Sequence, residues 1–108
     1  MRRKDYGAAL EHYRQMSAAI PGDAAAEAGI GWALLELGRF AESAATLEQV
    51  WTRSRTKFAG SQLAVAYAAL GRDDLAESLV KQLYPPESVK QELERARRSA
   101  QTLRSRRR

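Results

Sequence analysis

The chain has 108 residues and a formal net charge of +5, so it is long enough for one modest domain and too short for a second lobe that closes a cleft. It contains no cysteine and one histidine, His12, which excludes disulfides, thiolate metal sites, a cysteine nucleophile and a histidine-rich zinc site. Alanine contributes 20 residues, so we expect a helical protein whose core is built from closely packed small side chains.

The N-terminal segment, residues 5–22, predicts one amphipathic helix. Tyr6, Leu10 and Tyr13 recur at spacings of four and three residues, which places them on one helical face. A Pro-Gly dipeptide then ends the segment, and Asp23 is the expected N-cap of the next helix.

Residues 23–55 and 56–87 each predict a pair of helices joined by a tight turn. Apolar side chains recur at helical spacing in both units, and Gly38 and Gly71 stand where the first helix of each pair must end. The two units repeat each other at an offset of 33 residues. The repeat is clearest in Trp-Ala-Leu-Leu-Glu-Leu-Gly-Arg at residues 32–39 and Val-Ala-Tyr-Ala-Ala-Leu-Gly-Arg at residues 65–72.

Residues 88–108 predict a final amphipathic helix with an arginine-rich tail. A Tyr-Pro-Pro sequence separates it from the repeats, because proline cannot extend the preceding helix. Ser88 stands three residues before Gln91, as in a capping box, and an apolar stripe flanked by basic residues follows. We expect this helix to cover the exposed face of the last repeat, and residues 104–108 to fray into solvent.

These spacings resemble the tetratricopeptide repeat, a two-helix unit of about 34 residues with the pattern Trp-x2-Leu-Gly-x2-Tyr, then Ala-x3-Phe, then Pro. Three departures stand out: the first aromatic residue is absent from both full units, Ser43 replaces alanine, and Arg55 replaces proline. The pattern falls on Glu27, Ile30, Gly31, Leu34, Ser43, Leu47 and Arg55 in the middle unit, and on Gly60, Leu63, Ala64, Tyr67, Ala76 and Val80 in the last unit.

The resemblance implies an all-α solenoid of helical hairpins. Residues 1–87 would form about two and a half repeats, and residues 88–108 would form a C-terminal capping helix. Gly31 and Ala64 fall where paired helices cross, so a larger side chain at either position would push the helices apart.

The resemblance also implies a non-catalytic scaffold or adaptor that binds a peptide or helix of another protein in a concave groove. The first helices of the units would line this groove with mostly small, apolar side chains. Trp32 is either an anchor for the partner or a packing residue between the leading half repeat and the next unit. The candidate groove residues are Trp32, Leu35, Glu36, Phe58, Gln62 and Val65. No catalytic set, phosphate loop or metal-ligand spacing is present in the sequence, so we expect no enzyme activity, cofactor or metal.

Two further surfaces are candidates for contacts. The N-terminal helix lacks a first-helix partner, so we expect self-association or partner docking on its apolar face, unless the chain is a piece of a longer array. That face comprises Tyr6, Leu10, Tyr13 and Met16. The segment 88–108 carries eight basic and two acidic residues, and it is the basis of an alternative function, binding of nucleic acid or an anionic membrane surface. Its candidate residues are Arg97, Arg98, Arg104, Arg106, Arg107 and Arg108.

The expected location is the cytoplasm. No apolar run approaches the roughly 18 residues that span a bilayer, and the basic start of the chain leads into polar residues instead of an apolar signal sequence. Arginine outnumbers lysine 14 to 4, which together with the alanine content is typical of a GC-rich bacterial genome, so the scaffold is expected to be part of a larger bacterial assembly.

Overall fold

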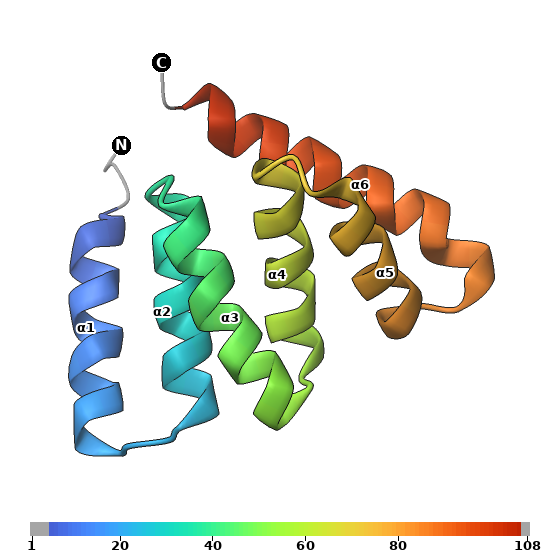
Figure 1. The fold of residues 1–108 in the computed structure, drawn as a ribbon. Coiled ribbons are helices and arrows are strands. Elements are labelled where there is room, and N and C mark those ends of the chain that lie inside the picture. Colours follow the sequence, from blue (N-terminus) through green and yellow to red (C-terminus); the bar gives the residue numbers. More distant parts are fainter. Residues whose placement is uncertain (1–4, 107–108) are drawn as a thin grey trace.

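The structure is a computed structural model that describes residues 5–106, and within that range the chain forms six α-helices with short connections (Figure 1). The helices are α1 (Tyr6–Ala19), α2 (Ala24–Glu36), α3 (Phe40–Ser54), α4 (Lys57–Ala69), α5 (Asp73–Leu83) and α6 (Pro86–Ser105). The fold is an all-α solenoid of helical hairpins, in which α2 pairs with α3 and α4 with α5. The predicted half repeat is α1, and the predicted capping helix is α6.

Helix α2 starts, and helices α2 and α4 end, at the residues that the sequence indicates. Asp23 Oδ1 accepts a hydrogen bond from Ala25 N at 3.1 Å, which caps α2. Gly38 and Gly71 follow α2 and α4 with φ of 82° and 78°, a conformation that glycine adopts without strain. The residues after them donate to carbonyls one turn back, Arg39 N to Leu34 O and Arg72 N to Tyr67 O, so the same turn recurs 33 residues apart.

The contact between α2 and α3 explains why serine occupies a position where the repeat pattern has alanine. An ideal Cβ at Gly31 would lie 2.5 Å from Cγ and Cδ2 of Leu47, so the two helices approach too closely for a side chain at Gly31. Ser43 is fully buried beside this contact, and its hydroxyl donates to Gly31 O at 2.7 Å. The buried hydroxyl therefore has a partner.

The arginine that replaces the expected proline ends α3 in a left-handed conformation. Arg55 has φ of 31°, which a proline ring cannot adopt. Its guanidinium carbon lies 5.1 Å from the centroid of the Trp51 ring, within the range of a cation–π contact. The chain thus turns into α4 through a backbone conformation that proline could not adopt.

The core consists mainly of leucine and alanine, as the composition predicts. Its largest cluster joins both hairpins to α6, because Leu47, Leu63 and Leu79 lie in the same contact group as Leu93 and Leu103. Small side chains let these helices pack closely.

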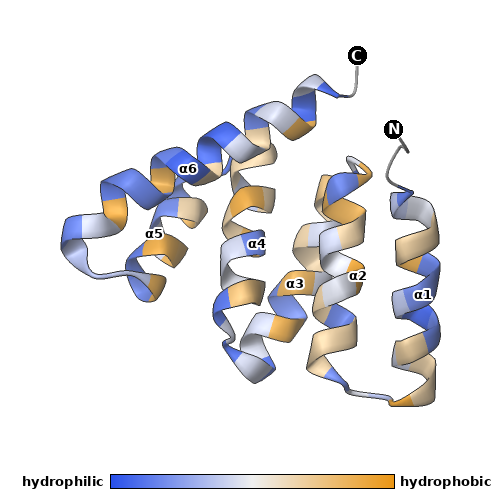
Figure 2. Ribbon diagram, turned by 180° about the vertical axis from the view of Figure 1, so that it is seen from behind, coloured by the Kyte–Doolittle hydropathy of each residue, from blue (hydrophilic) through white to orange (hydrophobic). Residues whose placement is uncertain are grey.

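The capping helix α6 is longer at both ends than the sequence predicted. It begins at Pro86 instead of after Ser88, since proline is compatible with the first turn of a helix. It continues through Arg104 to Ser105, where fraying was expected, while residues 107 and 108 lie outside the described residues. Figure 2 shows apolar residues on one side of α6 and polar residues over most of the rest.

The length of α6 determines where its end lies. At 20 residues it is about 30 Å long, whereas α4 and α5 have 13 and 11 residues. Its apolar residues, from Leu93 to Leu103, are buried against the last repeat, and its final turn extends past α4 toward α2 (Figure 1). None of the helices between residues 5 and 106 is long and apolar enough to cross a membrane.

Candidate partner-binding site

A hollow of about 280 Å³ lies between α2, α4 and α6. Five of the six predicted groove residues line it: Trp32, Leu35, Glu36, Gln62 and Val65. Phe58, the sixth, does not line this hollow, because it lies in the first turn of α4, where its side chain is 49% exposed. The repeat spacing therefore brings together residues from the first helices of both units.

The third wall of the hollow comes from α6, for which the sequence predicted a capping role and a basic surface. Ser99, Thr102, Leu103 and Arg106 complete the lining. One feature of the sequence could have indicated these α6 residues. The apolar stripe of the last helix is too long for one short helix to cover, so its end must contact another part of the protein. With these residues the lining is a mixture of apolar and polar groups, so the expectation of a mostly small, apolar groove is wrong.

An ion pair connects the end of α6 to the end of α2 across this hollow. Arg106 Nη1 donates to Glu36 Oε1 at 2.8 Å, and the Arg106 guanidinium carbon lies 5.9 Å from the centroid of the Tyr6 ring. The hydrogen bond with Glu36 is the main cause that raises the pKa of Arg106 above its ordinary value. Arg106 is therefore a permanent cation at this edge.

The indole of Trp32 packs against α1 while it lines the hollow. Its ring meets Tyr6 edge to face at a centroid distance of 5.6 Å and Tyr13 at 6.5 Å. The structure therefore shows Trp32 packed against the half repeat and half-buried at the hollow, and its role as an anchor for a partner stays a prediction. A substitution at Trp32 would disturb this packing as well as the hollow.

The apolar face of α1 is largely covered by α2, so the expectation that Leu10 is free for docking is wrong. Leu10 is 4% exposed and packs in a cluster with Ala33 and Leu34. The Tyr13 ring lies against Gly29, where an ideal Cβ would come within 2.5 Å of it. Of the four predicted docking residues, Met16 alone is exposed, at 37%. Self-association of the chain stays a prediction.

The predicted basic tail is partly neutralised by the body of the protein. Arg97 Nε lies 3.5 Å from Asp73 Oδ2 on α5, and Arg106 pairs with Glu36. Arg98 and Arg104 are exposed, whereas Arg107 and Arg108 lie outside the described residues. Within residues 5–106 no group of three or more His, Cys, Asp or Glu side chains is placed to hold a metal ion.

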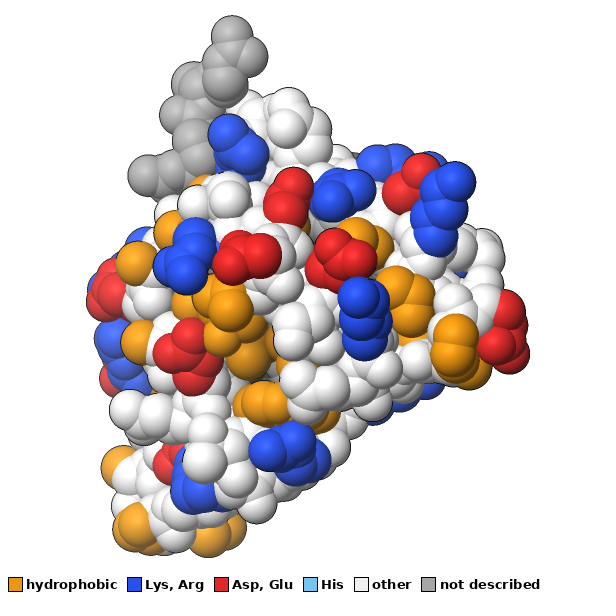
Figure 3. All heavy atoms as spheres, turned by 45° about the vertical axis from the view of Figure 1, so that its right-hand side comes forward, with side chains coloured by type: hydrophobic (Ala, Val, Ile, Leu, Met, Phe, Trp, Pro, Cys, Tyr) orange, Lys and Arg blue, Asp and Glu red, His pale blue; other side chains and the backbone are white. Residues whose placement is uncertain are grey.

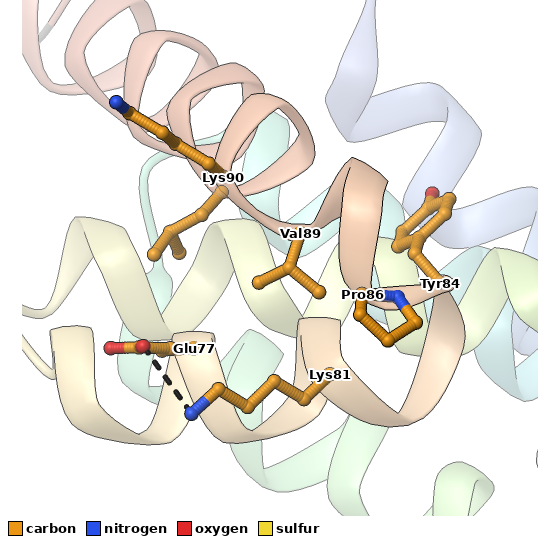
Figure 4. A pocket seen from close by; sticks show the side chains of 7 residues that line it. Glu77, Lys81, Tyr84, Pro86, Val89 and Lys90 are labelled. Carbon is orange, nitrogen blue, oxygen red and sulfur yellow. Dashed lines mark ion pairs between the residues drawn. The ribbon is translucent and has the colours of Figure 1, made fainter.

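A second, larger hollow of about 540 Å³ lies between α5 and α6 (Figure 4). Tyr84, Val89 and Leu93 give it apolar walls, and Lys81 Nζ lies 3.5 Å from Glu77 Oε2 at its edge. From the sequence, the α6 residues Val89 and Leu93 belong to the apolar stripe of the predicted capping helix, so this hollow was not predicted. Figure 3 shows apolar side chains reaching the surface between acidic and basic ones when the right-hand side of the molecule is turned forward.

Comparisons with known proteins bear on the fold and not on a partner. A sequence profile described as tetratricopeptide repeat matches residues 1–56, just over half of the chain. No curated protein and no solved structure gives a significant match. The profile match agrees with the recurring Gly-Arg turns, the paired helices and the close contact at Gly31. The chain belongs to the tetratricopeptide repeat family.

Proposed function

We propose that this chain is a non-catalytic protein–protein interaction scaffold that holds an extended segment of a partner in the hollow between α2, α4 and α6. The family supports the general role, because interaction with other proteins is typical of tetratricopeptide repeats. The observation that carries the proposal is the convergence of five groove residues, from two different helices, on one hollow.

The size of the hollow favours an extended peptide over a helix. A volume of about 280 Å³ lies just below the range of roughly 300–1,000 Å³ for ligand pockets and suits one or two side chains. An α-helix with its side chains is about 10–12 Å wide and would not enter this space. A partner would therefore insert side chains from an extended segment and leave most of its backbone at the rim.

The lining offers an extended segment both apolar contacts and hydrogen bonds. Leu35, Val65 and Leu103 present apolar surface, which favours burial of an aliphatic or aromatic side chain. Gln62 and Thr102 carry amide and hydroxyl groups that donate and accept hydrogen bonds, so they suit the backbone of an extended peptide.

A substitution that fills the hollow from its rim tests this proposal. Thr102 is exposed on α6 and lines the hollow, so Thr102→Trp should block it without removing a core side chain. Gln101→Trp is the matched control, because Gln101 is the exposed neighbour of Thr102 and does not line the hollow.

The probes are peptides selected on the wild-type protein from a random library, with binding measured by fluorescence anisotropy. We expect Thr102→Trp to weaken binding by about tenfold or more, a loss of about 1.4 kcal/mol, and Gln101→Trp to bind like the wild type. Equal binding by all three proteins would mean that peptides bind elsewhere. Circular dichroism checks that both variants are folded.

A further inference from the structure

One corner of the hollow already holds a guanidinium group, and that group belongs to the chain itself. Arg106 lies just after the last residue of α6 and is 70 residues from Glu36 in the sequence, yet the two are joined by a 2.8 Å hydrogen bond. The Glu36 side chain is 17% exposed, so most of its surface is already removed from water. The corner therefore presents a carboxylate that is mostly shielded from water and is paired with a guanidinium.

The aromatic side of this corner is fixed by other rings. The Tyr6 ring lies 5.9 Å from the Arg106 guanidinium carbon, and Trp32 holds Tyr6 in an edge-to-face contact at 5.6 Å. A carboxylate beside an aromatic ring offers a guanidinium a charge-assisted hydrogen bond and a cation–π contact together. A lysine ammonium would match this planar arrangement less well.

We propose that Glu36 and Tyr6 form a subsite for an arginine side chain of the bound peptide, and that Arg106 occupies this subsite in the free protein. The inference rests on the proposed function, which it deepens by naming the chemistry of one partner side chain and its internal competitor. An incoming arginine takes the place of Arg106, so one guanidinium is exchanged for another at the same carboxylate.

The ion pair between Arg106 and Glu36 is separate from the contacts that pack α6 against the repeats. The Arg106 side chain is 48% exposed, whereas α6 is held to the repeats by its buried stripe from Leu93 to Leu103. Release of Arg106 therefore leaves the helix in place. The nearest arginine in sequence to Glu36, Arg39, is engaged by Glu42 through two hydrogen bonds of 2.7 and 2.9 Å, so it does not compete for this carboxylate.

The test uses two amidated peptides, acetyl-Ala-Leu-Arg-Leu-Ala and the same sequence with citrulline, which has the shape of arginine without its charge. The full chain is compared with Arg106→Gln and with the double variant Arg106→Gln, Glu36→Gln. Arg104→Gln is the matched control, since it removes the same charge from an exposed position two residues away. Titration of each protein is followed by NMR at the Trp32 indole N–H.

We expect Arg106→Gln to bind the arginine peptide about fivefold or more tightly than the wild type, because the internal competitor no longer reduces the fraction of open subsite. The citrulline peptide should gain nothing, Arg104→Gln should behave like the wild type, and the added Glu36→Gln should abolish the gain. Circular dichroism establishes that each variant is folded.

Three results would overturn the proposal. These are no gain from Arg106→Gln, an equal gain for the citrulline peptide, which would make Arg106 a steric block only, and no binding of the arginine peptide to any of the proteins. The selected peptides distinguish this failure from failure of the proposed function. If Thr102→Trp weakens their binding while arginine gives no advantage, the hollow binds peptides and the arginine subsite does not exist.

Discussion

Replacement of Gly31 by alanine tests the contact on which α2 and α3 pack. The new methyl carbon would lie 2.5 Å from Cγ and Cδ2 of Leu47, well inside the distance at which two carbon atoms repel. Leu47 is fully buried, and the 2.7 Å hydrogen bond from Ser43 to Gly31 O ties the same two helices together. The methyl group is therefore accommodated only if a helix or the Leu47 side chain moves.

Two opposing effects set the magnitude of the change. Alanine in place of a helical glycine is favoured by about 0.5–1 kcal/mol, whereas overpacking of a tight core costs about 1–3 kcal/mol. The midpoints of these ranges leave a net cost, so we expect the free energy of unfolding to fall by about 1 kcal/mol, from the 5–15 kcal/mol that is typical of a domain. Urea unfolding followed by circular dichroism measures this loss.

Gly7→Ala is the matched control, because Gly7 is exposed on α1 and a Cβ there meets only Asp5 Oδ1, at an ordinary 3.5 Å. It should leave the free energy of unfolding unchanged or slightly higher. A Gly31→Ala variant as stable as the wild type would refute the packing argument. In combination with Leu47→Ala, which alone should cost about 2–5 kcal/mol, the methyl group has space, so the combined loss should be smaller than the sum.

Three further substitutions have defined outcomes. Ser43→Ala restores the residue of the repeat pattern but removes the buried hydrogen bond to Gly31 O, so urea unfolding should show a loss of about 1 kcal/mol; a more stable variant would contradict this reason. Arg55→Pro also restores the pattern, yet it should lower the melting temperature, because φ of 31° is closed to proline; an unchanged melting temperature would mean that the turn rearranges freely. Burial, and after it a 2.6 Å hydrogen bond to Glu48, raise the pKa of the Tyr67 hydroxyl. The neutral hydroxyl therefore adds to the free energy of unfolding in full below about pH 10, the pKa of tyrosine in the unfolded chain, and this contribution is lost as the pH rises further. Tyr67→Phe should therefore lose less stability than the wild type between about pH 9 and about pH 11, and parallel pH profiles would contradict this.

The fold could be predicted from the sequence where local chemistry decides it. Gly38 and Gly71 end helices because they adopt positive φ, and Asp23 starts one because its carboxylate accepts a backbone N–H. Leu10 shows the limit of such reasoning. Its exposure depends on which neighbour covers α1, and helical periodicity identifies an apolar face without identifying the helix that packs on it.

The candidate site could be predicted from the sequence only in part, because its position also depends on how the helices pack. The repeat spacing put Leu35 and Val65 on the same surface, because equivalent positions of stacked units line up. It did not predict the α6 wall, which depends on the direction of α6. Figure 1 shows α6 running obliquely to α4, so the helix leaves the last repeat before it ends.

The oblique course of α6 couples the cap to the hollow. The buried stripe from Leu93 to Leu103 covers about 15 Å of helix, more than the 10–12 Å width of a single helix, so an oblique helix that buries all of it must extend beyond α4. Leu103 is buried in the core and also lines the hollow, which means that one side chain serves stability and the binding surface together. Loss of the last turn of α6 would therefore remove a wall of the hollow and the arginine that occupies it, while the upstream stripe kept the last repeat covered.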